Sequence, residues 1–90
     1  MLNFALIEDD LQLLNFLSNT LESIFMQHNF DAAVVLQTSN INHLFQYIQN
    51  NKIDVLLLDI DLNSDLDGIQ IAKKIRKNNS KCKRFSFKSR

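Results

Sequence analysis

The chain lacks proline and has one cysteine, one glycine and no long apolar run. The single Cys82 excludes an internal disulfide bond. No apolar run approaches the roughly 20 residues that a membrane-spanning helix needs. Acidic residues at 8–10 stand where a signal peptide would require an apolar stretch. We therefore expect a cytoplasmic protein with no membrane partner.

Neither sign of charge is in excess, since ten acidic residues balance ten basic ones. The two signs are separated along the chain, however: every acid lies at or before Asp67, and nine of the ten basic residues lie at or after Lys73. The basic segment 79–90 has no motif beyond its charge, and we interpret it as a solvated terminus. We therefore expect no direct contact with nucleic acid.

The composition that is present, 46% hydrophobic and 22% charged, is typical of a soluble globular domain. Ninety residues allow one small domain and leave no room for a separate output domain. Short apolar runs alternate with segments of helical periodicity. The runs predict strands at about 2–7, 32–37 and 54–59, and the periodicity predicts helices at about 10–28, 40–49 and 69–77.

This alternation of strands and helices predicts an α/β fold with a parallel sheet, in which ligands bind beyond the carboxyl ends of the strands. Acidic residues stand at these ends: Glu8 and Asp9 follow the first strand, and Asp59 ends the third. If the two strands are neighbours, three carboxylates meet at one edge of the sheet. Three kinds of site place carboxylates in this way.

A calcium loop is the first kind, because Asp59, Asp61 and Asn63 match its first, third and fifth ligand positions. The loop also requires glycine at its sixth position and glutamate at its twelfth, where this chain has Ser64 and Gln70. A haloacid-dehalogenase-type phosphatase is the second kind, with Asp59 and Asp61 as its aspartate pair. The chain is too short to supply the later motifs of that family.

A phosphate-accepting aspartate beside magnesium is the third kind, and it uses every acid at the expected edge. Glu8, Asp9 and Asp59 would bind the ion, and the backbone carbonyl of Asp61 would supply one more oxygen. Magnesium would neutralise charge on the incoming phosphoryl group while Asp59 attacks it.

The chain here resembles the receiver domain of two-component response regulators. The resemblance rests on "LIEDD" after an apolar strand, on "VLLLDIDL" and on "DLDGIQIAKKIR", and it covers residues 1–78. It implies a flavodoxin-like, three-layer α/β fold with parallel strands in the order 2-1-3 and flanking helices. It also implies a phosphorelay protein rather than an enzyme, with Asp59 as phosphoacceptor, Mg²⁺ as cofactor and a sensor histidine kinase as phosphodonor.

Two departures from the commonest receiver pattern resemble the accessory-gene-regulator group of LytTR-type regulators, which control quorum sensing and transcription. The first acid of the pair is Glu8, and the loop after Asp59 lacks the usual methionine and proline and is one residue longer.

The resemblance implies a truncated receiver that ends before strands four and five are complete. Segment 79–90 is then a remnant of strand four or a frameshifted end, and Ser89 is a weak candidate for the switch hydroxyl. The third strand would become a sheet edge and favour self-association. The alternative function is an inactive receiver fragment that acts only as a binding module.

Overall fold

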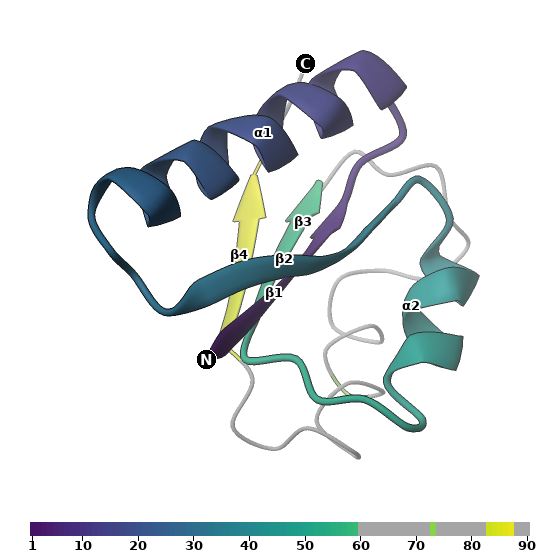
Figure 1. Cartoon of the computed structure of the whole chain (residues 1–90). Helices are drawn as coiled ribbons and strands as arrows, with labels where there is room; N and C mark the ends of the chain where they lie inside the picture. Colours follow the sequence, from purple (N-terminus) through teal and green to yellow (C-terminus); the bar gives the residue numbers. More distant parts are fainter. Residues whose placement is uncertain (60–72, 74–82, 88–90) are drawn as a thin grey trace.

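The computed structural model describes residues 1–59, residue 73 and residues 83–87. Within these residues lie four strands and two helices, in the order β-α-β-α-β-β along the chain (Figure 1). Their bounds are β1 Leu2–Ile7, α1 Leu11–Gln27, β2 Ala32–Thr38, α2 Ile41–Tyr47, β3 Val55–Asp59 and β4 Lys83–Phe87. The predicted helix at 69–77 lies outside the described residues, apart from the helical Lys73.

Side-chain caps fix where both helices begin. The Asp10 carboxylate accepts hydrogen bonds from the backbone N–H groups of Gln12 and Leu13, at 3.0 and 3.2 Å. The Asn40 side chain accepts one from the N–H of Asn42 at 2.9 Å. Each cap satisfies donors that the first helical turn leaves without an intrahelical partner. Neither helix is long and apolar enough to cross a membrane.

The strands form one sheet in the order β2-β1-β3-β4, and all neighbouring pairs are parallel. The predicted order 2-1-3 is therefore confirmed. The expectation that the third strand forms an edge is wrong, because β4 pairs with β3 along its whole length, from Val55 opposite Lys83 to Asp59 opposite Phe87. Phe85 and Phe87 alternate with the polar Arg84 and Ser86, which is the period of a strand.

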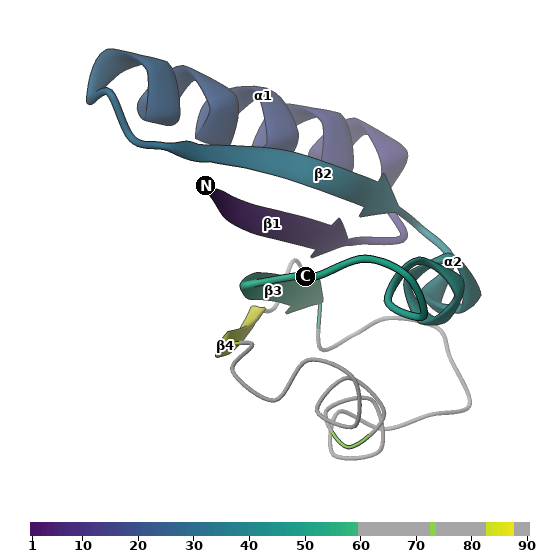
Figure 2. The same ribbon diagram turned by 60° about the horizontal axis from the view of Figure 1, so that its bottom comes forward.

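The two faces of the sheet are covered by different helices, so the molecule has three layers (Figure 2). On one face the ring of Phe4 in β1 lies 4.9 Å from the ring of Phe25 in α1. On the other face, alternate residues of β1 and β3 pack against α2 in a core of Ala5, Ile7, Ile41, Leu44, Ile48, Ile53, Leu56 and Leu58. Alternation along the strands thus supplies both layers of the core.

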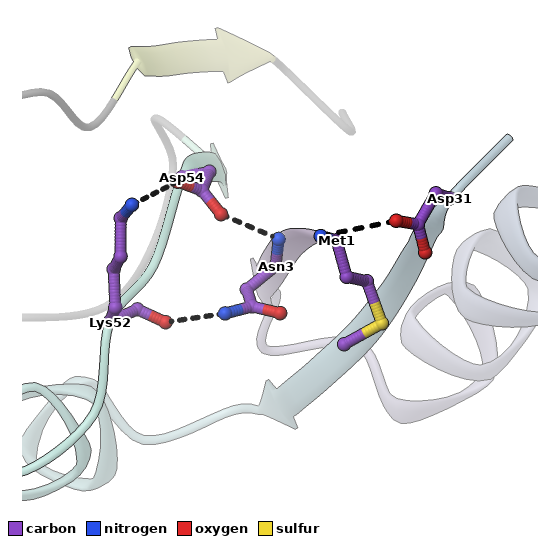
Figure 3. Close-up of polar contacts among 5 residues, drawn as sticks. All are labelled: Met1, Asn3, Asp31, Lys52 and Asp54. Carbon is purple, nitrogen blue, oxygen red and sulfur yellow. Dashed lines mark hydrogen bonds and ion pairs between the residues drawn. The ribbon is translucent and has the colours of Figure 1, made fainter.

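Polar contacts hold the amino ends of the strands together (Figure 3). The backbone N–H of Asn3 donates to the Asp54 carboxylate at 2.8 Å, and the Asn3 amide donates to the carbonyl of Lys52 at 3.2 Å. The amino group of Met1 pairs with Asp31 at 3.2 Å. The hydrogen bond from Asn3 is the main reason that the pKa of Asp54 is lowered. These contacts fix the start of β3 against β1 at the amino ends of the strands. Glu8, Asp9 and Asp59 lie at the opposite, carboxyl ends.

Candidate metal and phosphoacceptor site

The register between β1 and β3 brings the predicted acids to one place. Ile7 lies opposite Leu58, so the residues that follow, Glu8 and Asp9 after β1 and Asp59 at the end of β3, meet at the carboxyl edge of the sheet. One carboxylate oxygen from each of the three acids lies within 4.8 Å of the other two.

This cluster is mostly buried. Glu8 is 0% exposed and Asp59 is 1% exposed, whereas Asp9 is half-buried. Two carboxylates at this separation repel each other by about 3 kcal/mol at an effective dielectric constant of about 20. Three negative charges are therefore unstable together unless a proton or a cation lies among them.

The pKa of Glu8 is raised by its position in this buried cluster. Burial, above all, raises the pKa of Glu8 from 4.5 to about 7. A hydrogen bond from the backbone N–H of Asp10, at 3.0 Å, acts in the opposite direction. The neighbouring carboxyls of Asp59 and Asp9 raise the pKa further. At neutral pH the cluster thus takes up a proton more readily than exposed carboxyls would.

The donor set fits a hard divalent cation. All three groups offer carboxylate oxygens, which magnesium and calcium prefer to nitrogen or sulfur. Magnesium usually takes few protein carboxylates and keeps several waters, and the half-buried Asp9 gives the cluster a partly open side. The residues at this edge therefore fit a magnesium ion, which would remove the repulsion that the fold creates.

Sequence reasoning missed two residues that support this edge. Thr38 ends β2 and is 6% exposed, and its carbonyl accepts the backbone N–H of Glu8 at 3.1 Å. The Thr38 hydroxyl lies 2.8 Å from Nδ1 of His43. The sequence around His43 shows no acidic residue or cysteine at the spacing of a metal site. The position of Thr38 at a strand end was the available signal. The contact with His43 depends on how α2 packs, which the sequence pattern does not reveal.

Two other predicted site residues, Asp61 and Ser89, lie outside the described residues. The segment before Asp59 is a strand. A calcium loop of the kind weighed above follows a helix, so this observation removes that alternative.

Comparisons with known proteins agree with the fold. The family model for the response regulator receiver domain matches residues 4–87. Among solved structures, the MaeR response regulator bound to beryllium trifluoride is similar to this chain at 25% identity, with a TM-score of 0.72. The match covers 100% of this chain and 69% of that one. No curated protein matches the chain.

The receiver match over residues 4–87 also leaves the phosphatase alternative without support. With the parallel sheet in the order β2-β1-β3-β4 and its acids at the carboxyl edge, the chain belongs to the response regulator receiver domain family.

Proposed function

We propose that the chain is a phosphoacceptor receiver domain in which Asp59 takes a phosphoryl group from a sensor histidine kinase. The observation that carries this proposal is the meeting of Glu8, Asp9 and Asp59 within 4.8 Å at the carboxyl edge. A site for phosphoryl transfer needs a nucleophile and a cation next to each other, and these three acids can supply both functions.

Each acid has a distinct part in the proposal. Asp59 ends β3, a strand that pairs with β1 as far as Leu58 and with β4 as far as Asp59 itself, so its carboxylate has a fixed position as nucleophile. Glu8 and Asp9 bind the cation, together with Asp59 and the backbone carbonyl of Asp61. Magnesium, when bound, neutralises charge on the phosphoryl oxygens. The hydrogen bond from Asp10 to Glu8 orients the Glu8 carboxylate.

The burial of Asp59 at 1% exposure has a kinetic consequence. A donor reaches the carboxylate only when neighbouring groups move aside, so we expect slow and incomplete phosphorylation by a small donor such as acetyl phosphate. The phosphoryl group is transferred to the protein itself, and we expect no turnover of a substrate.

Phosphorylation can be tested by intact-mass spectrometry after incubation with acetyl phosphate and Mg²⁺. We expect a fraction of the wild-type chain to gain one phosphoryl group slowly and Asp59→Asn to gain none. Asp31→Asn is the matched control, because Asp31 lies just before β2, at the amino ends of the strands and away from the acids at the carboxyl ends. Its side chain is 84% exposed. Equal labelling of the wild-type and Asp59→Asn chains would assign the modification to another residue.

Beryllium trifluoride offers a second test, because on a carboxylate oxygen it has the tetrahedral geometry of a phosphoryl group. The MaeR structure was obtained with this compound. We expect Mg²⁺ and beryllium trifluoride together to shift the backbone amide resonances of Glu8, Asp9 and Asp59.

Asp9→Ala should weaken Mg²⁺ binding in a calorimetric titration, and an unchanged affinity would contradict the assignment of Asp9 as a ligand.

The narrower assignment is a LytTR-type, quorum-sensing transcription regulator of the cytoplasm. It is supported by Glu8 as the first acid of the pair and by the longer segment after Asp59. For the end of the chain we prefer the fourth-strand interpretation of 79–90, because β4 spans Lys83–Phe87 and the family match runs to residue 87. Truncation of the receiver stays a prediction from the resemblance.

A further inference from the structure

Thr38 connects the carboxyl end of β2 to the acids that follow β1. It is the last residue of β2, and its carbonyl accepts the backbone N–H of Glu8 at 3.1 Å. Glu8 is buried, so its carboxylate has little room to compensate for a shift of its own backbone. The place of the Glu8 carboxylate therefore depends on where the end of β2 lies.

The hydroxyl of Thr38 binds this strand end to the first turn of α2. It accepts the backbone N–H of Asn40, the residue that caps the helix, at 3.1 Å. It also lies 2.8 Å from Nδ1 of His43. Figure 2 shows β2 leading into α2 beside the carboxyl end of β1. Because Thr38 is buried, loss of its hydroxyl would leave the N–H of Asn40 without this acceptor.

An irregularity in β2 is what turns Thr38 toward α2. The pairing with β1 shifts register after Val34: Phe4 lies opposite Val34, but the next residue of β1 lies opposite Leu36. In a regular strand, Val34, Leu36 and Thr38 would share one face. Here Val34 lies on the face of Phe4, whose ring contacts α1, whereas Leu36 packs against the core around α2. The bulge thus re-aims the last residues of β2, as bulges near functional sites commonly do.

We propose that Thr38 is a positioning residue for the metal site: α2 holds its hydroxyl, and its carbonyl holds the backbone of Glu8. Groups that orient a metal ligand change metal affinity without touching the ion, and Thr38 acts on Mg²⁺ only through Glu8. This inference rests on the proposed function, because it concerns Mg²⁺ binding by the acids. It adds β2 and α2 to the elements that build the site.

A positioning role differs from a general contribution to stability. A general loss of stability speeds hydrogen exchange along the whole of β1, whereas a positioning role acts at the end of the strand. The amides of Ala5 and Leu6, earlier in β1, therefore serve as internal references for the amide of Glu8.

Hydrogen exchange of the metal-free chain, followed by NMR, tests the first half of the proposal. Thr38→Val removes the hydroxyl and keeps the β-branched shape. We expect the Glu8 amide of this variant to exchange about fivefold faster relative to those of Ala5 and Leu6, since one hydrogen-bonded contact at the strand end is lost.

A calorimetric Mg²⁺ titration of the full 90-residue chain tests the second half. Thr38→Val should raise the Kd for Mg²⁺ about fivefold, because the effect reaches the ion through the Glu8 backbone alone. Thr38→Ser keeps the hydroxyl and should stay within about twofold of the wild-type Kd.

Gln37→Ala is the matched control. Gln37 precedes Thr38 in β2, and its side-chain amide donates to Asn15 in α1 at 3.3 Å, on the other face of the sheet. This variant removes a polar contact from the same strand end and should change neither the Glu8 exchange nor the Kd.

His43→Ala is the second test and uses an exposed position, where a substitution is well tolerated. It removes one of the two contacts of the Thr38 hydroxyl and should change both readouts in the same direction as Thr38→Val, by about twofold. If Thr38→Val does not fold, a His43→Ala chain with both readouts unchanged would contradict the proposal.

Unchanged exchange at Glu8 in a folded Thr38→Val chain would overturn the positioning role, whether or not the chain binds Mg²⁺. Faster exchange with an unchanged Kd would overturn the connection to the metal site. A wild-type chain that binds no Mg²⁺ would instead contradict the proposed function, and the exchange data would still decide whether Thr38 holds Glu8 in place.

Discussion

At the scale of one residue, Glu8 shows how burial among other acids at the edge of a sheet changes the pKa of a carboxyl group. Its carboxyl is fully buried, and burial together with the neighbouring Asp59 and Asp9 raises its pKa to about 7. The folded state therefore binds a proton that the unfolded chain releases at lower pH. Stability and the state of the site are linked through this one group.

The raised pKa of Glu8 predicts a definite pH dependence of stability without divalent ions. Below the unfolded pKa of 4.5 the contribution of the neutral Glu8 is fully present, and it is lost as the pH rises through about 7. The loss should be on the order of 3 kcal/mol. Urea unfolding at pH 5 and pH 8 measures it.

Glu8→Gln is the control for this dependence, because glutamine keeps the shape of the neutral acid and cannot ionise. We expect its free energy of unfolding to change much less between pH 5 and pH 8. Asp54 does not disturb this window: its pKa is lowered, so its contribution is present above the unfolded value of 3.8 and is lost only as the pH falls through the still lower folded pKa. A wild-type chain that becomes more stable toward pH 8 would contradict the assignment.

At the scale of the element, local sequence signals predicted the helix starts better than they predicted the strand β4. Polar residues before an apolar periodic segment are typical helix starts, and the sequence offers two candidate caps for each helix, Asp9 or Asp10 and Ser39 or Asn40. The structure shows Asp10 and Asn40 as the caps. The strand β4 was difficult to predict, since Lys83 and Arg84 suggest a solvated tail. Only the pairing with β3 shows that this segment is a strand.

The cap of α1 gives a prediction at this scale. Asp10→Ala removes the acceptor for the N–H groups of Gln12 and Leu13 and should lower the free energy of unfolding by about 1 kcal/mol. Asp10→Ser keeps a capping oxygen and should lower it by only a few tenths of a kcal/mol. Chemical denaturation compares the two variants, and equal losses would mean that the cap contributes nothing.

At the scale of the whole molecule, a helix contributes to the protection of an outer strand of the sheet. Among the described strands β2 lies at one end of the order β2-β1-β3-β4. The Glu22 carboxylate reaches from α1 and accepts the backbone N–H of Val34 in β2 at 2.7 Å. An outer strand whose N–H is already bonded is a poor template for a further strand, so this protection depends on the packing of α1 on the sheet.

Removal of the Glu22 side chain should make the β2 edge available to another strand. Glu22→Ala frees the N–H of Val34, so we expect larger species in light scattering at high concentration than the wild-type chain gives. Glu22→Gln is the matched control, because its amide oxygen still accepts this hydrogen bond. Identical size distributions for the two variants would show that this hydrogen bond does not protect β2.

The sequence by itself determined the alternation of strands and helices and the acids at the strand ends, because these depend on local periodicity and on residue type. Tertiary structure decided which strands are neighbours, and hence that Glu8, Asp9 and Asp59 meet within 4.8 Å. It also decided that β3 lies inside the sheet and that the carbonyl of Thr38 accepts the backbone N–H of Glu8. Such contacts join residues far apart in the chain, and local sequence patterns carry no information about distances across a sheet.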